Sequence, residues 1–256
     1  MEFVSGDPYH TKDRQAELLS MMKDVHRFLE ENQISYCLCG GSLLGAIRHN
    51  GFIPWDDDLD IMLDRANYQR LLSVFDQCDG YTIERELWIY RIKRKKERKK
   101  DGESSGAQSE AMIDVFVVDH APRSKFKQRM KVMLIKILQG MIKAKPELQK
   151  MSFAYKICSV ATYLFGKLFL QKFKLRMYDG ISQIGNKKEA DFVGCYNDIF
   201  KNLHIQYQKD VCSSVELHTF EDTEFYIPVA YEECLVKQYG DWRTPPAEAE
   251  RIPMHL

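Results

Sequence analysis

Four aspartates, Asp56, Asp57, Asp58 and Asp60, lie within five positions directly after Trp55. Carboxylates this close repel one another and bind protons more tightly unless a cation or a basic cluster neutralises them. If Asp58 and Asp60 lie on a strand, the two-residue period places both on one face, where hard cations such as Mg²⁺ bind. The segment therefore predicts a divalent metal site; an acidic surface turn is the alternative.

A further acid, Asp114, interrupts the apolar run from Met112 to Val118, which is typical of a buried strand. An unpaired carboxylate in such a strand is costly, so Asp114 needs a partner. A metal ion shared with Asp58 and Asp60 would provide one. The alternative is an acid on an edge strand that faces solvent.

Gly40, Gly41 and Ser42 follow the apolar run 34–39, so a buried strand should lead through a tight turn into a helix that begins near Ser42. Free backbone N–H groups at a helix N-terminus bind phosphate, and glycines let the phosphate approach closely. The serine hydroxyl adds a donor. On its own this motif is weak, because most such turns are only turns.

Three basic residues are further candidates for phosphate contacts. Arg48 and His49 follow the glycine helix and could bind phosphate oxygens, or they could be an exposed pair at a helix end. Lys93 ends a predicted strand and could face a diphosphate, or it could be a solvated lysine.

The order of these motifs resembles the nucleotidyltransferase superfamily, whose fold is that of DNA polymerase β. The 22 residues from Cys39 to Asp60 are similar to the signature of the LicD family, which includes bacterial phosphocholine transferases and the animal fukutin-related protein. Further stretches resemble that family's later motifs: 113–116, 228–233, 239–242 and 245–246.

The resemblance implies transfer of a phospho-alcohol from a CDP-alcohol donor to a sugar hydroxyl, with release of CMP. The acceptor would be a glycan or lipid-linked glycan precursor of the cell surface, as in lipopolysaccharide or teichoic acid, and the alcohol choline, ribitol, glycerol or ethanolamine. It implies Mg²⁺, with Mn²⁺ as an alternative, bound by Asp58, Asp60 and Asp114. We assign Asp56 as the general base or a ligand of a second metal. Two alternatives stay open: a nucleotidyltransferase that moves NMP from an NTP to a small molecule or RNA, and a non-catalytic descendant that binds nucleotide or membrane.

Helices and strands must position these residues. The sequence pattern predicts an α/β (α+β) fold with a mixed, partly antiparallel sheet. Apolar residues at Leu18, Met22, Val25 and Leu29 predict an amphipathic helix from about Thr11 to Asn32. Strands are expected at 59–63, 81–84, 87–93 and 112–118, with Asp64 capping the next helix and a last helix within 226–242 that closes the site. We expect a single domain with a core at 1–123, a helical insertion at 124–180 and a C-terminal segment at 181–256.

The composition, with 45% hydrophobic and 29% charged residues in 256, is that of a folded globular protein. The 37 basic and 37 acidic residues balance, yet Ser124–Tyr178 holds thirteen Lys or Arg and one acid, and Arg91–Lys100 holds eight and one. The basic helices could contact an anionic membrane or form an ordinary packed subdomain. No aromatic residue interrupts Arg91–Lys100, so nucleic acid is not the expected partner.

Seven cysteines without a C-x-x-C pair predict reduced thiols and a cytoplasmic location. The first eleven residues lack the layout of a signal peptide. Lys156 and Lys167 interrupt the most apolar window, 151–170, so a membrane span is not expected. Peripheral contact with the inner face of the cell membrane stays open.

Overall fold

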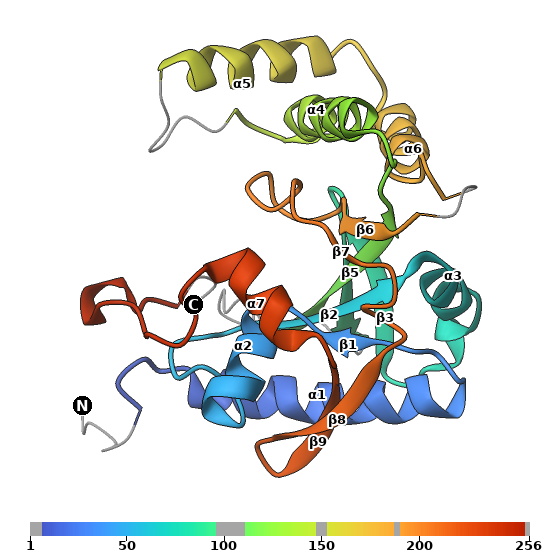
Figure 1. The fold of residues 1–256 in the computed structure, drawn as a ribbon. Helices are drawn as coiled ribbons and strands as arrows, with labels where there is room; N and C mark the ends of the chain where they lie inside the picture. Colours follow the sequence, from blue (N-terminus) through green and yellow to red (C-terminus); the bar gives the residue numbers. More distant parts are fainter. Residues whose placement is uncertain (1–6, 96–110, 147–152, 187–189, 254–256) are drawn as a thin grey trace, which may run out of the picture. The chain divides into compact units, whose positions relative to one another are not determined.

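The computed structural model describes residues 7–95, 111–146, 153–186 and 190–253, which fold as a mixture of helices and strands (Figure 1). This confirms the α+β class. The chain divides into two compact units. The first consists of Met1–Glu84, Tyr90–Phe116 and Asp210–Leu256, and the second of Arg85–Ile89 and Val117–Lys209. The single-domain organisation expected above stays a prediction.

The sheet of the first unit has the strand order β1-β2-β5-β4-β3. Its strands are β1 (Cys37–Leu38), β2 (Leu59–Asp64), β3 (Tyr81–Glu86), β4 (Ile89–Arg94) and β5 (Met112–His120). β1 pairs antiparallel with β2, and β4 pairs antiparallel with β5. The expected strands are therefore present, and β2 and β5, which carry Asp60 and Asp114, are neighbours.

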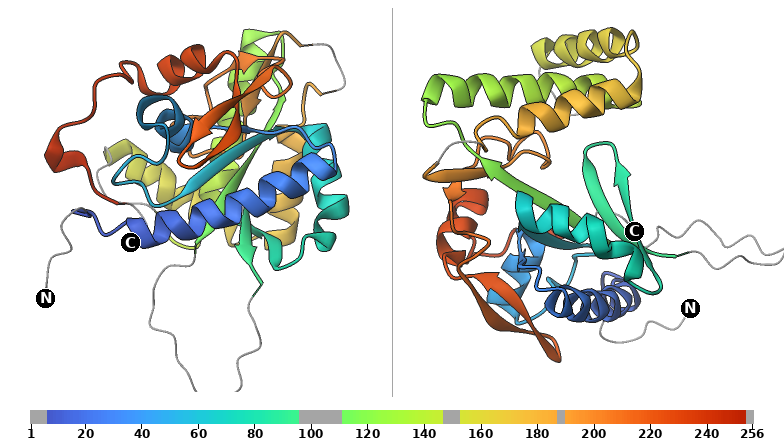
Figure 2. Two further views of the ribbon diagram at one scale, coloured as in Figure 1. Left: turned by 90° about the horizontal axis from the view of Figure 1, so that it is seen from below. Right: turned by 90° about the vertical axis from the view of Figure 1, so that its right-hand side faces the viewer.

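Helices and a hairpin complete the first unit (Figures 1 and 2). They are α1 (Lys12–Glu31), α2 (Gly40–His49), α3 (Arg65–Val74), α7 (Tyr231–Tyr239) and the antiparallel pair β8 (Val215–Phe220) and β9 (Thr223–Pro228), with short 3₁₀ helices at Phe75–Gln77 and Glu248–Glu250. α1 buries the predicted stripe, Leu18, Met22, Val25 and Leu29. It contacts the sheet through Tyr81, whose hydroxyl donates to Asp24 Oδ2 at 2.7 Å.

Local sequence signals were mostly correct, with three differences. Asp64 caps α3 as predicted and accepts from the backbone N–H of Asn67 at 2.7 Å. α2 begins at Gly40, two residues earlier than Ser42, because Gly40 adopts φ +55° and lets the helix start inside the glycine turn. Neither the β8–β9 hairpin nor the 3₁₀ helix at Glu248–Glu250 was predicted. Residues 96–100 of the basic run lie outside the described residues.

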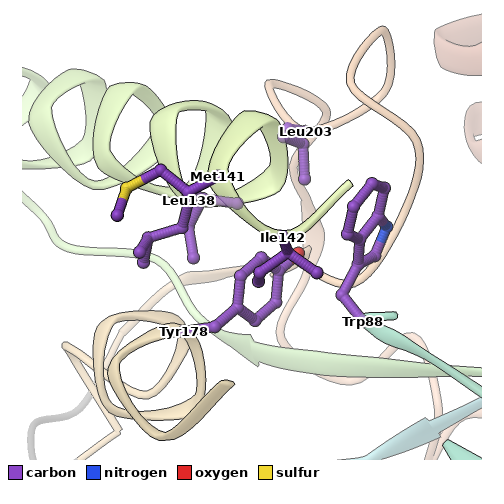
Figure 3. Packing of buried hydrophobic residues seen from close by; sticks show 7 residues of the cluster. Trp88, Leu138, Met141, Ile142, Tyr178 and Leu203 are labelled. Carbon is purple, nitrogen blue, oxygen red and sulfur yellow. The ribbon is translucent and has the colours of Figure 1, made fainter. Parts of the chain in front are cut away.

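The second unit contains three helices, α4 (Lys125–Ile142), α5 (Phe153–Gly166) and α6 (Gln171–Ser182), which confirms the helical character expected of 124–180. The end of β5 pairs antiparallel with β6 (Phe192–Cys195), and β6 pairs with β7 (Tyr207–Gln208). Figure 3 shows the core of this unit, in which Leu138, Met141 and Ile142 of α4 pack near Tyr178 of α6, with Trp88 and Leu203 beside them. No described helix is long and apolar enough to cross a bilayer.

Two of the thirteen basic residues of 124–178 have structural roles inside the second unit. Lys131 is 2% exposed, donates to the carbonyl oxygens of His120 and Ile184 at 3.0 Å each, and lies 3.6 Å over the Tyr196 ring. Lys174 is also buried and donates to the Met141 carbonyl oxygen at 2.8 Å. Part of the basic character of this segment therefore stabilises the fold.

Candidate functional site

The glycine turn and the acidic segment meet at the N-terminus of α2, within the first unit. A Cβ atom added to Gly40 would lie 2.5 Å from Asp60 Oδ2, and one added to Gly41 would lie 2.5 Å from Asp56 Oδ2. Two carboxylates therefore lie directly against the first turn of the helix. The partial positive charge of a helix N-terminus favours this arrangement.

Ser42 fixes the acidic segment to α2. Its side chain is 3% exposed, and its Oγ accepts the backbone N–H of Asp60 at 2.8 Å. The backbone N–H of Cys39 donates to the Asp60 carbonyl oxygen at 3.2 Å. The serine thus sets the register between α2 and the start of β2; the phosphate contact expected of its hydroxyl stays a prediction.

The carboxyl groups of the acidic segment interact strongly with one another. Burial, together with the charge of Asp58 and a hydrogen bond to it, raises the pKa of Asp56 to about 8. Asp57 is 3% exposed and adds further negative charge. Held this close and partly out of water, these carboxyl groups repel one another, as expected of acids that lack a neutralising cation.

The loop that carries the acids is braced from both sides. At its start Asn50 adopts the left-handed conformation, and Glu221 in the β8–β9 turn accepts the backbone N–H of Phe52 at 3.0 Å. At its end Gln15 of α1 donates to the carbonyl oxygens of Ile53 and Asp56 at 3.0 and 2.8 Å. Neither brace could be predicted from local patterns, because each joins segments far apart along the chain.

The C-terminal helix contributes Tyr239 to the acidic cluster. Burial raises the pKa of its hydroxyl, and the charges of Asp60, Asp56 and Asp58 raise it further. The residue as a whole is 42% exposed, so the buried part is the hydroxyl end of the side chain. Tyr239 was part of a family motif in the sequence, but nothing there placed it beside the acids.

Arg48 and His49 lie at the other end of α2 and have unsatisfied donors. Arg48 Nη1 donates to the Trp242 carbonyl oxygen at 3.0 Å, which ties α2 to the segment after α7. Arg48 Nε, His49 Nδ1 and Trp242 Nε1 are buried and have no hydrogen-bond partner among the described residues. Burial and the charge of Arg48 lower the pKa of His49, which favours the neutral ring. Unsatisfied buried donors beside an arginine suit an anion.

Asp114 has a protein partner that the sequence analysis did not identify. Arg91 lies opposite it on β4, and Arg91 Nε donates to Asp114 Oδ1 at 2.8 Å. In the sequence Arg91 stands out only as part of a basic run. A basic residue on the strand before Asp114 is the signal that could have indicated the ion pair. Lys93 is the third basic residue expected to contact phosphate, and its Nζ lies 3.9 Å from Glu84 Oε2 on β3.

As the side chains stand, the described residues contain no group of three or more His, Cys, Asp or Glu arranged to hold a metal ion. The donor chemistry nevertheless fits Mg²⁺, which binds through one or two carboxylates together with substrate phosphates. Asp56 and Asp58 are two adjacent carboxyl groups that interact directly, and Asp60 lies against the same helix turn. Burial and the neighbouring negative charges raise the pKa of Asp56, and a bound cation would oppose this effect.

The fold and the site together define a class of protein: an α+β protein with carboxylates gathered at a glycine-rich helix N-terminus. Residues 33–141, which include the glycine turn and every predicted metal ligand, match the family model for the nucleotidyltransferase domain of LicD, FKTN and FKRP. Over this segment the chain is similar to the LicD family.

Among its relatives is the lipopolysaccharide cholinephosphotransferase LicD of Haemophilus influenzae, 28% identical over 265 residues that cover 96% of each chain. Two uncharacterized proteins, of Rickettsia prowazekii and Rickettsia typhi, are 38% and 36% identical over 112 and 122 residues. These matches cover 43% and 46% of this chain but only 35% and 34% of the two Rickettsia proteins.

Proposed function

We propose that the protein transfers phosphocholine, or another phospho-alcohol, from a CDP-alcohol to a sugar hydroxyl of a cell-surface glycan precursor, releasing CMP. The observation that carries the proposal is the contact of the Asp56 and Asp60 carboxylates with the N-terminal glycines of α2. Similarity to the LicD family over residues 33–141 and similarity along 96% of the chain to a cholinephosphotransferase support it.

Mg²⁺, or Mn²⁺ in its place, would be held by Asp58 and Asp60 with Asp114 as a third acid, and would neutralise charge on the diphosphate. The chain's own groups then have separate tasks. The N–H groups at the start of α2 bind and orient phosphate oxygens, and Arg48, His49 and Lys93 are the proposed further contacts. Asp56, whose burial and neighbours make it a stronger base than an ordinary carboxylate, accepts the proton of the attacking hydroxyl.

The proposed donor and acceptor place the reaction in the cytoplasm, where a CDP-alcohol and a lipid-linked precursor would meet. In-line displacement at phosphorus needs little covalent chemistry from the protein, so positioning and charge neutralisation account for most of the rate. The site offers both through a braced acidic loop and a helix N-terminus.

The product identifies the reaction. Incubation with CDP-choline, CDP-ribitol or CDP-glycerol, Mg²⁺ and a glycan acceptor should release CMP and yield a modified sugar. Release of pyrophosphate from CTP or ATP would instead support a nucleotidyltransferase. A thermal-shift panel of the same nucleotides with and without Mg²⁺ identifies the donor, because only the correct one should stabilise strongly in the presence of the ion.

The double variant Asp58→Asn/Asp60→Asn should lower transfer by about 10³-fold or more, since it removes the proposed metal ligands and leaves shape unchanged. Asp76→Asn/Asp79→Asn, two exposed aspartates elsewhere in the first unit, is the matched control and should keep wild-type turnover. Wild-type turnover in Asp58→Asn/Asp60→Asn would refute the assignment.

A further inference from the structure

In the second unit, α5 packs against α4 with its small and polar side chains. A Cβ atom on Gly140 of α4 would overlap Thr162, and one on Gly166 would overlap the backbone of Met141. Thr162 Oγ1 is satisfied within α5 by the carbonyl oxygens of Cys158 and Ser159, at 2.8 and 3.1 Å. The side of α5 that contacts α4 is therefore short and uncharged, which allows the two helices to approach closely.

The opposite side of α5 is apolar and exposed, which reverses the usual arrangement of a surface helix. Phe153, Ile157 and Leu164 follow the i, i+4, i+11 spacing of one helix face, and Phe165 lies beside them. The loop that follows adds Leu168 and Leu170. We call these six residues the α5 face: Phe153, Ile157, Leu164, Phe165, Leu168 and Leu170, which are 80%, 54%, 57%, 54%, 75% and 81% exposed.

The α5 face is a concentrated patch. Ten large apolar side chains of the described residues are more than half exposed, and six of them are these. Single exposed apolar residues are ordinary on a protein surface, but a contiguous group marks a surface that contacts an apolar partner. In Figures 1 and 2, α5 lies along α4 with its other side uncovered by the rest of the second unit.

Every charged residue within the segment 153–178, which contains this face, is basic. Lys167, Lys172 and Arg176 are exposed, Lys156 is partly exposed, and no Asp or Glu occurs between residues 153 and 178. Two copies of such a surface would repel each other. The surface of a bilayer that contains anionic lipids offers both apolar depth and complementary charge.

We propose that the α5 face is a membrane-docking surface that lies flat on a bilayer containing anionic lipid. At 14 residues α5 is about 21 Å long, too short for the roughly 30 Å hydrocarbon core, so it lies in the interface plane. The apolar side chains enter the boundary between headgroups and acyl chains, and the lysines contact lipid phosphates. This proposal is independent of the transfer reaction proposed above.

The test is co-sedimentation of the full chain with vesicles of phosphatidylcholine alone, or of phosphatidylcholine mixed with phosphatidylglycerol, without any nucleotide or glycan. The protein should bind the anionic vesicles and bind the neutral ones much more weakly. Leu164→Asp/Leu168→Asp should lower the partition coefficient by about tenfold or more. Ile199→Asp/Ile252→Asp changes two exposed residues outside the face, 52% and 65% exposed, and should bind as the wild type does.

A second variant, Lys167→Glu/Lys172→Glu, keeps the apolar face and tests the charge separately. We expect a loss of about fivefold for each lysine. Failure of the wild type to bind anionic vesicles, equal binding by Leu164→Asp/Leu168→Asp and its control, or unchanged binding by the lysine variant would each overturn the proposal. So would a dimer in sedimentation velocity that Leu164→Asp/Leu168→Asp dissociates, because the face would then belong to a second copy.

Discussion

The substitution Gly41→Ala should displace one carboxylate without destabilising the fold, so it tests the position of that carboxylate on its own. Gly41 lies in the first turn of α2 and its φ is not among the positive values of the described residues, so alanine fits its backbone. The three atoms nearest to an added Cβ all belong to the carboxyl group of Asp56, with Oδ2 at 2.5 Å. Ordinary contact requires about 3.4 Å, so Asp56 must move by about 0.9 Å.

The size of the expected effect follows from that displacement. A misplacement of about 1 Å in a catalytic group costs on the order of 10²-fold in rate, and we expect a loss of this size in transfer activity. Stability should be unchanged or raised by up to about 1 kcal/mol, because alanine forms helix more readily than glycine and a carboxylate can rotate away.

The assay compares turnover and thermal midpoint for the wild type, Gly41→Ala and Gly180→Ala. Gly180 lies in α6, and a Cβ added there meets nothing within 4 Å, so its alanine variant should be slightly more stable and fully active. Wild-type activity in Gly41→Ala would refute a functional role for the position of Asp56. An unfolded Gly41→Ala would refute the claim that the added Cβ meets chiefly a movable carboxylate.

Two further predictions concern stability. Arg91→Ala removes the ion pair between Arg91 and Asp114, whose side chains are 21% and 12% exposed. We expect the free energy of unfolding in urea to fall by about 2 kcal/mol, less than the about 3–5 kcal/mol for a fully buried pair. Arg91→Lys should lower it less. Burial lowers the pKa of His26 below 6.5, so its stabilisation is fully present above that pH and declines as the pH falls. Between about pH 7.5 and 5.5 the melting temperature of the wild type should therefore fall further than that of His26→Gln, and parallel curves would contradict the prediction.

The sequence predicted those parts of the fold that depend on neighbouring residues. The stripe of α1, the glycine turn before α2 and the Asp64 cap each follow from a few adjacent side chains, and the structure has all three. The alternation of Leu59, Ile61 and Leu63 with Asp60 and Met62 similarly predicted β2, but the strand begins at Leu59 and leaves Asp58 outside it. The expectation that these acids and the glycine turn share one site came from the resemblance to the LicD family, not from these local patterns.

The parts that the sequence analysis missed depend on contacts between distant segments. Arg91 meets Asp114 because β4 pairs with β5 in one register, and periodicity does not specify a register between strands. Glu221 braces Phe52 from a hairpin 169 residues away, and Arg48 reaches the Trp242 carbonyl oxygen 194 residues away. The same limit applies to α5. Its apolar stripe alone predicts a buried face, and only its orientation on α4 shows that the stripe is exposed.

The bracing of the acidic loop by the C-terminal segment affects how the protein matures on the ribosome. Tyr239 follows Asp56 by 183 residues, so at typical elongation speeds of about 5–20 residues per second it is synthesised roughly 10–40 s later. Throughout that interval the nascent chain carries the aspartates without Tyr239, and for most of it also without Glu221. Any activity that depends on this geometry therefore begins only after translation has passed Tyr239.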